Sequence, residues 1–455
     1  MPALTCFKAY DIRGIVGTDL TSDIAFSIGR AFAQTLCARC VVIGRDCRPS
    51  SLELLQATAN GLMAAGADVL DLGLCGTEEM YHATTHFGAD GGIEITASHN
   101  PAQYNGMKMV GRGSAPLDPA TDFSAIRVLA ESADFHPAKR GEFQPATGAR
   151  DAYTAHVLGF ITPAAIKPLT ILVNAGNGAA GPTFDALATA LGATPLRFIR
   201  HNHPPDGTFP NGVPNPQLVQ NHAMTADAVI ACGADMGVAW DGDFDRCFMF
   251  DHTGAFIPGE YIVGLLAQAF LAKEPQAAIA YEPRVIWNTQ DIIAKFGGRA
   301  ILSKTGHSHM KRALRDHNAV YGGEMSAHHY FRDFMACDSG MIPWLLVAEL
   351  MGRTGQTLAN LVAPRVAAFP SSGEINFTLA DPKAAIARVA AVFAPTATAI
   401  DETDGLSISF ANWRLNLRHS NTEALLRLNV EARGDRALVS QAVAKITALI
   451  DGQAP

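Results

Sequence analysis

The sequence predicts an α/β protein of several domains, in which three similar α/β units precede a smaller C-terminal α+β unit. Short apolar runs alternate with helix-like periodicity three times, as is typical of layered folds with mainly parallel strands. The last part of the chain shows a period of two instead, which favours half-buried antiparallel strands. The length of 455 residues allows two to four domains, at roughly 150 residues each.

Each of the first three units begins with a short apolar run that a polar turn follows. The runs cover residues 40–44, 169–173 and 277–280, and the turns cover residues 45–51, 174–182 and 281–288. Short apolar runs between helical patterns are typical of strands covered by helices. The spacing therefore predicts three α/β units, although their residues do not match well enough to form a sequence repeat.

The C-terminal part alternates apolar and polar residues. The apolar positions are Leu406, Ile408 and Phe410 in one segment and Leu426, Leu428 and Val430 in another. Residues 436–450 carry one apolar stripe, which predicts a closing helix. We therefore expect four domains, at residues 1–148, 149–252, 253–367 and 368–455.

Composition excludes several classes of protein. Hydrophobic residues make up 48% and charged residues 17%, so the chain can bury large cores and is not disordered. The net charge of -8 argues against a nucleic-acid partner, and an anionic substrate would need cations concentrated in one cleft. The longest apolar stretches are too short to span a bilayer, and the first residues lack the apolar core of a signal peptide. Eight cysteines without a dense spacing pattern suggest free thiols, so we expect a cytoplasmic protein without a membrane partner.

One acidic run is the sharpest local signal. Residues 241–246 read Asp-Gly-Asp-Phe-Asp-Arg, so three carboxylates occupy alternate positions. They would repel one another without a cation among them, and hard oxygen ligands suit Mg²⁺ or Ca²⁺. An EF-hand is excluded because Arg246 and His252 stand where it requires glycine and glutamate. By itself, the run fits a metal site and a solvated acidic turn equally.

Ser98 lies in a polar turn, residues 96–101, that follows an apolar run. Its hydroxyl could act as a nucleophile or a phosphate carrier, although the turn lacks the G-x-S-x-G pattern of hydrolases. We expect His99, as the immediate neighbour, to be poorly placed as a base for Ser98. Taken alone, an ordinary Ser/Asn turn with local hydrogen bonds explains the segment better.

A loop between two predicted C-terminal strands offers groups that suit a phosphate dianion. They are a guanidinium fork, two hydroxyls and an amide, from Arg418, Ser420, Asn421 and Thr422. An ordinary polar hairpin loop explains the same residues when they are taken alone.

Three other polar segments carry candidate groups, at residues 7–14, 304–307 and 322–329. In the last of them, Glu324 and Ser326 could hydrogen-bond sugar hydroxyls, and His328 could move a proton. The first contains two cations and a phenol, and an exposed strand explains it as well. Residues 176–181 match G-x-G-x-x-G, but no acidic residue follows at the spacing of a dinucleotide site, so we expect a tight strand-to-helix turn.

Together, six of these segments resemble the α-D-phosphohexomutase family, and within it the bacterial enzymes of phosphomannomutase/phosphoglucomutase type. They are FKAYDIRG (7–14), TASHNP (96–101), DGDFDR (241–246), KTGH (304–307), GEMSAHHYF (323–331) and RHSNTE (418–423). They follow the order and spacing of the family over essentially the whole chain. The resemblance implies three similar α/β domains with mixed sheets and a C-terminal α+β domain, arranged around a central cleft.

The resemblance implies that Ser98 is the phosphoserine that donates and re-accepts phosphate. It also implies one Mg²⁺ per chain, bound by Asp241, Asp243, Asp245 and an oxygen of phosphorylated Ser98. The residues that it places around the phosphoserine are Arg13, His99, Asn100, Lys108 and Arg246. Such a group suits phosphoryl transfer, which depends chiefly on positioning and on neutralising charge.

The resemblance also assigns the substrate contacts. The sugar positions are Tyr10, Arg284, His307, Glu324 and Ser326, with His328 as a proposed acid or base. The loop for the non-reacting phosphate contains Arg418, Ser420, Asn421 and Thr422. Three residues depart from the family pattern: Arg284 replaces a frequent lysine, Ala327 a common glycine and Ala424 a common proline.

The implied activity is the interconversion of mannose 6-phosphate and mannose 1-phosphate, with hexose 1,6-bisphosphate as intermediate and activator, in the supply of GDP-mannose. A glucose or dual specificity remains an alternative, because mannose and glucose differ only at C2. A metal-dependent sugar phosphatase is a second alternative, and net release of inorganic phosphate would reveal it. A non-catalytic sugar-phosphate binder is a third. No feature predicts an oligomeric state.

Overall fold

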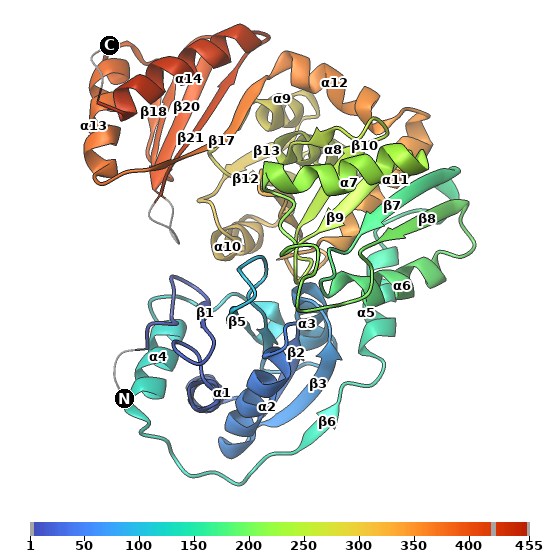
Figure 1. The fold of residues 1–455 in the computed structure, drawn as a ribbon, viewed down its shortest axis with the longest axis vertical. Coiled ribbons are helices and arrows are strands. Elements are labelled where there is room, and N and C mark those ends of the chain that lie inside the picture. The colour runs from blue at the N-terminus through green and yellow to red at the C-terminus, as the bar shows by residue number, and fades with distance from the viewer. Residues whose placement is uncertain (1–3, 420–424, 453–455) are drawn as a thin grey trace. The chain divides into compact units, whose positions relative to one another are not determined.

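The computed structural model describes residues 4–419 and 425–452, and Figure 1 shows the fold. The chain forms two compact units. The first consists of Met1–Phe256 and His328–Gly355, and the second of Ile257–Ala327 and Gln356–Pro455. The segment expected to form a third domain, 253–367, is therefore divided between the units, and the four expected boundaries remain a prediction.

The first sheet mixes parallel and antiparallel strands in the order β1-β5-β4-β2-β3-β6. β2 is parallel to β3 and β4, whereas β5 is antiparallel to β1 and β4. The strands are β1 (Ile12–Ile15), β2 (Cys40–Arg45), β3 (Asp68–Leu74), β4 (Gly91–Ile95), β5 (Tyr104–Gly111) and β6 (Phe143–Pro145). The helices are α1 (Ser22–Thr35), α2 (Ser51–Ala64), α3 (Thr77–His86), the 3₁₀ turn η1 (Arg112–Ser114) and α4 (Asp122–Ser132). The predicted apolar run 40–44 thus forms a central strand.

The second sheet is also mixed. β7 is parallel to β8 and β9, and β9 is antiparallel to β10. The strands are β7 (Leu169–Asn174), β8 (Leu196–His201), β9 (Met236–Trp240), β10 (Cys247–Asp251) and β11 (Phe256–Ile257). The helices are α5 (Ala149–Leu158), η2 (Pro163–Ala165), α6 (Ala180–Ala190), η3 (Val219–Asn221) and α7 (His222–Cys232). Since β7 ends at Asn174 and α6 begins at Ala180, the glycine-rich residues 176–181 form the predicted strand-to-helix turn.

The middle of the chain contributes to both units. In the second unit, β12 (Ala278–Tyr281) is parallel to β13 (Arg299–Leu302) and β14 (Ala319–Gly323). Four helices accompany them: α8 (Gly259–Lys273), α9 (Trp287–Lys295), α10 (His307–His317) and α12 (Leu358–Ala368). In the first unit, β15 (His329–Phe331) is antiparallel to β16 (Cys337–Asp338), and α11 (Met341–Thr354) follows. In the described part of the chain, no helix combines the length and apolarity that a bilayer crossing requires.

The C-terminal sheet is antiparallel, in the order β17-β21-β20-β19-β18. The strands are β17 (Ser371–Thr378), β18 (Ala399–Asp401), β19 (Leu406–Ser409), β20 (Trp413–His419) and β21 (Leu425–Ala432), and the helices are α13 (Pro382–Phe393), η4 (Ala394–Thr396) and α14 (Arg436–Ile450). The predicted apolar positions Leu426, Leu428 and Val430 are fully buried in its core. The structure thus confirms the antiparallel strands that the period of two predicted, and α14 covers the residues predicted to form a helix.

A group of histidines lies where α3 packs against α5. His82 is buried, with ring centroids of His86, His156 and Phe334 at 5.5, 5.1 and 6.4 Å, and Tyr153 packs edge-on against it. Burial, and secondarily the neighbouring histidines, lower the pKa of His82 from 6.5 to about 4. The folded protein therefore holds this ring neutral at pH values where the unfolded chain would bind a proton.

We expect this burial to make the protein less stable in mild acid. Because the folded pKa is depressed, stability is complete above pH 6.5 and is lost as the pH falls towards 4, by about 2 kcal/mol at pH 5. His82→Phe, which keeps an aromatic ring, should remove this part of the pH dependence when urea unfolding is compared at neutral and acidic pH. The exposed His136→Gln should leave it unchanged, and an equal loss in His82→Phe would contradict the assignment.

Ala327, where the resemblance leads us to expect a glycine, has a left-handed backbone with φ 69°. A side chain at such a φ costs free energy that glycine avoids, although glycine loses more entropy on folding. Ala327→Gly should therefore raise the free energy of unfolding by about 0.5 kcal/mol. Ala188→Gly, inside helix α6, should instead lower it by about 1 kcal/mol. A destabilised Ala327→Gly protein in urea unfolding would show that the backbone there is not strained.

Candidate active site

The turn that contains Ser98, residues 96–101, connects β4 and β5 and is called the serine turn. A buried arginine holds it in place. Arg48 donates hydrogen bonds to the carbonyl oxygens of Ser98, Asn100, Pro101 and Tyr104 at 2.6–3.0 Å. Ser98 itself has a left-handed backbone, with φ 48°. Such strain in a residue other than glycine is typical of functional sites and persists only where the surroundings enforce it. The Arg48 guanidinium group provides that enforcement.

A buried carboxylate anchors the same turn. Asp46 forms an ion pair with Arg48 at 3.2 Å and accepts hydrogen bonds from Ser51 Oγ at 2.5 Å and Thr96 Oγ1 at 2.8 Å. Thr96 Oγ1 in turn accepts a hydrogen bond from the amide of Ser98 at 2.9 Å. The backbone on both sides of the serine is therefore fixed by buried polar contacts.

His99, which we expected to be poorly placed as a base for Ser98, lies within hydrogen-bond distance of it. Ser98 Oγ lies 3.1 Å from His99 Nδ1, because the left-handed turn brings both side chains to one side. Burial, followed by the charge of Arg246, holds the pKa of His99 well below its usual range. The ring is therefore neutral, and its Nδ1 accepts a hydrogen bond from Arg246. The Ser98 hydroxyl donates to Asp241 Oδ2 at 2.7 Å.

The acidic run forms a buried turn between β9 and β10. Asp241, Asp243 and Asp245 each place an oxygen within 4.8 Å of the others. Among the described residues, Asp243 Oδ1 and Asp245 Oδ1 have no hydrogen-bond partner. A Cβ at Gly242 would lie 2.3 Å from the Ser98 carbonyl oxygen, so only glycine lets the two turns approach so closely. Carboxylate oxygens with unused lone pairs, beside a serine hydroxyl, fit a Mg²⁺ ion.

Two buried cations partly balance these carboxylates. Lys108 Nζ lies 2.7 Å from Asp243 Oδ2 and also bonds Asp245, while Arg246 Nη2 lies 2.6 Å from Asp241 Oδ2. Although burial opposes it, Lys108 holds the pKa of Asp243 below its usual range. Burial and the Asp243 carboxylate raise the pKa of Asp245 to about 6. The turn thus retains negative charge that a metal ion would neutralise.

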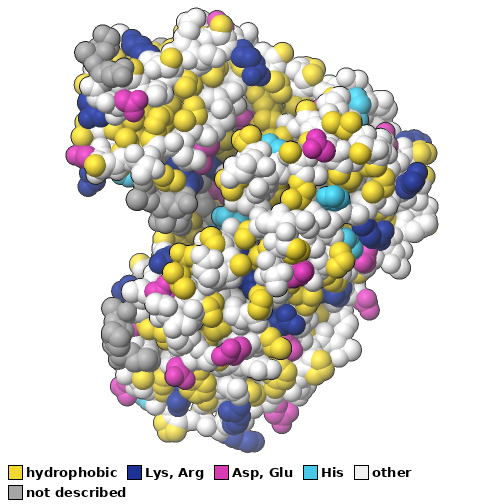
Figure 2. Space-filling view, viewed as in Figure 1, with side chains coloured by type: hydrophobic (Ala, Val, Ile, Leu, Met, Phe, Trp, Pro, Cys, Tyr) yellow, Lys and Arg dark blue, Asp and Glu magenta, His cyan; other side chains and the backbone are white. Residues whose placement is uncertain are grey.

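Arg13 brings a further cation to the serine turn. Its Nη1 donates to Asn100 Oδ1 at 2.7 Å, and its Nε donates to Asp11 Oδ2 at 2.9 Å. Tyr10 is half-buried and lies two residues before β1. On the face drawn in Figure 2, Lys and Arg side chains lie in small separate groups among acidic and apolar ones. The serine turn, in contrast, is contacted by three cations, Arg13, Arg48 and Arg246, which suits an anionic substrate.

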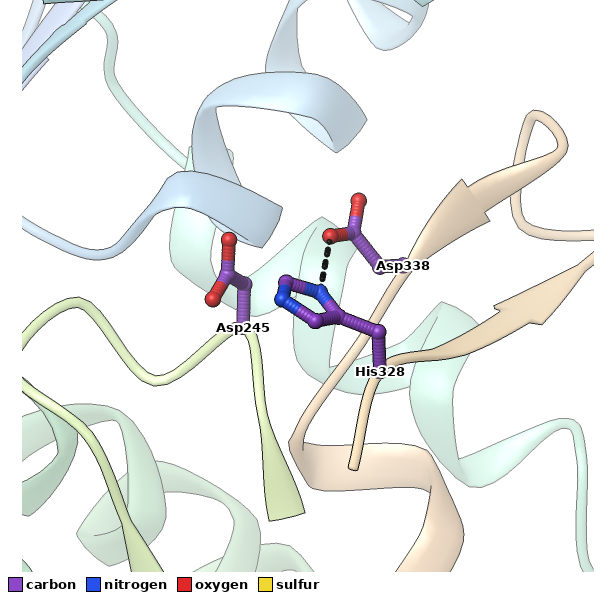
Figure 3. Close-up of side chains that lie close together, drawn as sticks. All are labelled: Asp245, His328 and Asp338. Carbon is purple, nitrogen blue, oxygen red and sulfur yellow. Dashed lines mark hydrogen bonds and ion pairs between the residues drawn. The ribbon is translucent and has the colours of Figure 1, made fainter. Parts of the chain in front are cut away.

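His328 belongs to the first unit, together with the acidic turn. Its Nδ1 lies 3.0 Å from Asp338 Oδ2, and Figure 3 shows the opposite edge of the ring facing Asp245. The backbone of His328 forms a β-bridge with Arg246, and Trp240 Nε1 donates to the Gly340 carbonyl oxygen at 2.8 Å. The sequence analysis placed His328 in one segment with Glu324 and Ser326. In the structure, those two residues belong to the second unit, whereas His328 belongs to the first.

The candidate sugar contacts lie together in the second unit. Glu324 Oε1 accepts a hydrogen bond from the amide of Gly306 at 2.6 Å, and His307 follows as the first residue of α10. Ser326 Oγ accepts a hydrogen bond from Arg284 Nη2 at 3.1 Å. The 322–327 turn is therefore connected both to the start of α10 and to a fully buried arginine.

The candidate phosphate contacts are described only in part. Arg418 lies near the end of β20 and donates to Glu374 Oε2 at 3.0 Å. Arg284 Nη1 donates to the same oxygen at 3.3 Å. The other predicted phosphate contacts, Ser420, Asn421 and Thr422, lie outside the described residues, as does Ala424.

Comparison with known proteins assigns every part of this arrangement to one family. Residues 5–136, 151–254 and 258–369 match the descriptions "Phosphoglucomutase/phosphomannomutase, alpha/beta/alpha domain" I, II and III, and residues 374–449 match the C-terminal domain of the same family. The chain belongs to the phosphoglucomutase/phosphomannomutase family. The predicted family and fold class are thereby confirmed, and the chain is a phosphohexomutase.

Several phosphohexomutases are similar over the full length. A phosphomannomutase from Salmonella typhimurium is 56% identical over 457 residues, which cover 99% of this chain and 100% of the relative. Proteins named phosphohexose mutases from Xanthomonas campestris are 52% identical over 452 residues, which cover 99% of this chain and 100% of theirs. A solved phosphoglucomutase/phosphomannomutase family structure from Burkholderia thailandensis has a TM-score of 0.87 at 32% identity, covering 100% of this chain and 99% of the other.

Sequence reasoning missed several residues that position the family motifs. Arg48 and Thr77 contact the serine and acidic turns, the latter through a 2.6 Å hydrogen bond to Asp243 Oδ2. Asp338 contacts His328, and Glu374 contacts two arginines. Arg48 and Asp46 both lie in the polar turn 45–51, so the sequence could have identified Arg48 as a candidate site residue. The other three are brought to the site by tertiary structure alone.

Proposed function

We propose that this chain interconverts mannose 6-phosphate and mannose 1-phosphate through a phosphoserine at Ser98. The observation that carries the proposal is the position of Ser98 Oγ, 2.7 Å from Asp241 Oδ2, beside two further buried carboxylates and two buried cations. A serine hydroxyl next to a metal-binding carboxylate group suits a phosphoryl carrier. The 56% identical Salmonella relative bears the name phosphomannomutase, which supports mannose as the sugar.

The proposed reaction moves one phosphoryl group out and another back. The bond between phosphorus and Ser98 Oγ breaks as a hydroxyl oxygen of the hexose phosphate bonds to phosphorus, which gives a hexose 1,6-bisphosphate. The hydroxyl proton passes to a base, which we assign to His328, whose contact with Asp338 orients the ring. After the sugar reorients, its other phosphoryl group returns to Ser98. Asp241, Asp243, Asp245 and a phosphoserine oxygen would hold a Mg²⁺ ion, which would supply positive charge beside the transferring group.

The second unit supplies the proposed substrate contacts. Glu324 and Ser326 bind sugar hydroxyls, and Arg418 binds the phosphate that does not react. Because the sugar must bind in two orientations, these contacts recognise a phosphate and hydroxyls rather than one end of the molecule. Mannose 1-phosphate production would serve GDP-mannose synthesis, and a hexose 1,6-bisphosphate would act as activator. The description of the matching family, phosphoglucomutase/phosphomannomutase, supports glucose phosphates as a second substrate class.

The test compares mannose 1-phosphate, glucose 1-phosphate and glucosamine 1-phosphate side by side, with Mg²⁺ and a hexose 1,6-bisphosphate. We expect rapid formation of mannose 6-phosphate, slower or equal formation of glucose 6-phosphate, and no net inorganic phosphate. Release of inorganic phosphate would instead establish a phosphatase. Failure to convert any of the three sugars would leave a sugar-phosphate binder as the function.

A further inference from the structure

Helix α3 begins directly against the acidic turn. Its first residue, Thr77, contacts Asp243 twice: the Thr77 amide donates to the Asp243 carbonyl oxygen at 3.2 Å, and the hydroxyl donates to Asp243 Oδ2 at 2.6 Å. Both residues are fully buried. A Cβ at the preceding Gly76 would lie 2.6 Å from that carbonyl oxygen, so glycine allows the close approach. The start of α3 thus packs against a residue that lies 166 positions further along the chain.

The two oxygens of the Asp243 carboxylate differ in their contacts. Oδ2 accepts the hydrogen bond from Thr77 and lies 2.7 Å from Lys108 Nζ. Among the described residues, Oδ1 has no hydrogen-bond partner, although it is buried. A buried acceptor without a donor is costly unless a ligand satisfies it. Oδ1 is therefore the oxygen that this arrangement leaves for a divalent cation.

The backbone of the acidic turn is fixed by contacts that do not involve the Thr77 side chain. In the glycine-rich turn 176–181, the Ala179 amide donates to the Gly242 carbonyl oxygen at 2.9 Å, and a Cβ at Gly178 would lie 2.8 Å from the same oxygen. Gly242 also lies against the Ser98 carbonyl oxygen. These contacts hold the main chain of the turn. They do not fix the rotation of the Asp243 carboxylate about its last torsion, which is broad for aspartate.

The Thr77 hydroxyl can fix that rotation, whereas Lys108 cannot do so alone. Lys108 Nζ is shared with Asp245, and an ammonium group is a point charge on a flexible stem. Thr77 is β-branched and lies in the first turn of a helix, so its hydroxyl has few positions. Hydrogen bonds from a second residue to a metal ligand orient that ligand, and removing them typically lowers metal affinity about 10- to 100-fold.

We propose that Thr77 is a positioning residue of the metal site, whose hydroxyl holds Asp243 Oδ2 and thereby presents Oδ1 to a divalent cation. The proposal rests on the proposed function, because that function places Mg²⁺ at the three aspartates. Thr77 acts through Asp243, so its loss should change the affinity for the metal and leave the KM for mannose 1-phosphate unchanged.

The experiment measures the binding of Mg²⁺ by calorimetry and of Mn²⁺ by its paramagnetic signal, on the full-length protein. Asp243→Asn defines which binding belongs to this site. Thr77→Val keeps the shape of the side chain without the hydroxyl, and Thr77→Ser keeps the hydroxyl without the methyl group. Thr77→Ala also lacks the hydroxyl and replaces the valine variant if that one does not fold. The matched control is Thr183→Val, because buried Thr183 donates at 2.7 Å to Oε2 of buried Glu79, a carboxylate that is not a predicted metal ligand.

Thr77→Val should weaken the binding of Mg²⁺ and Mn²⁺ about 10- to 100-fold, whereas Thr77→Ser should stay within about threefold of the wild type. Turnover of Thr77→Val at low Mg²⁺ should fall in proportion, and higher Mg²⁺ should recover most of it, with an unchanged KM for mannose 1-phosphate. Thr183→Val should lower the urea midpoint of unfolding, as Thr77→Val does, but should bind metal like the wild type.

Three results would overturn the proposal. Wild-type metal affinity in folded Thr77→Val or Thr77→Ala protein would show that the hydroxyl does not orient Asp243. An equal loss in Thr77→Ser would assign the effect to packing of the methyl group, and an equal loss in Thr183→Val would assign it to general destabilisation.

Failure of the proposed function would look different. A wild-type protein whose Mg²⁺ affinity depends on Thr77 as expected, but which converts no mannose 1-phosphate, would refute the proposed function and leave the role of Thr77 standing. Normal turnover with a metal affinity that does not depend on Thr77 would refute the assignment of Thr77 alone. Absence of Asp243-dependent metal binding in the wild type would refute both.

Discussion

Ser98→Ala should lower mutase turnover by about 10⁴-fold or more, because it removes the oxygen that we propose carries the phosphoryl group between substrates. Ser98 Oγ is the hydroxyl held between Asp241 and His99, whereas the nearby Thr77 hydroxyl donates to Asp243 instead. The loss should appear in kcat at saturating mannose 1-phosphate. The protein should also fail to acquire phosphate when it is incubated with hexose 1,6-bisphosphate.

The control for this variant is Ser132→Ala, an exposed serine in the same domain, which should keep full activity. Alanine keeps the Cβ at this left-handed backbone position, so the variant should still unfold cooperatively in urea, which shows that it is folded. Turnover within tenfold of the wild type in a folded Ser98→Ala protein would end the phosphoserine account.

Asp243→Asn should abolish tight binding of a divalent metal and lower turnover by about 10³-fold. The side chain has a buried oxygen without a described partner, and Lys108 favours its ionised form. Asparagine keeps the size but replaces one carboxylate oxygen by a donor, which cannot bind a cation. Calorimetric titration with Mg²⁺ and the paramagnetic signal of Mn²⁺ measure the binding without reference to turnover.

Asp227→Asn, on the exposed side of α7, is the matched control and should bind metal normally. The opposite result for Asp243→Asn, unchanged Mg²⁺ affinity in a folded protein, would place the metal elsewhere. A loss of turnover with intact metal binding would assign Asp243 a role in holding Lys108 instead.

The fold was predictable where one local pattern decided the structure. Alternation at Leu426, Leu428 and Val430 required a one-sided strand, and the apolar stripe of 436–450 required a helix against it. The proximity of the serine and acidic turns was predictable only through the family resemblance. In physical terms, each turn follows the carboxyl end of a strand with a parallel neighbour, β4 and β9, which is where α/β sheets build sites.

The other contacts of the site depend on backbone angles and on long-range packing, which no short sequence motif encodes. The distance between His99 and Ser98 follows from the φ of Ser98, which residue type does not determine. Asp338 reaches His328 because β15 and β16 fold back on one another. Glu374 lies in β17, and no local motif marks it. Its contacts with Arg418 and Arg427 form only because β20 and β21 lie beside β17 in the sheet.

The most direct test of the phosphoserine mechanism is a single transfer from enzyme to sugar. Protein phosphorylated on Ser98 by hexose 1,6-bisphosphate, freed of excess reagent, is mixed with mannose 1-phosphate and Mg²⁺ and stopped at short times. Mass spectrometry of the Ser98 peptide and chromatography of the sugars follow the phosphoryl group. We predict that Ser98 loses phosphate at the rate at which mannose 1,6-bisphosphate appears. Loss of phosphate from Ser98 to water, or mannose 6-phosphate formed while Ser98 stays unphosphorylated, would contradict the mechanism.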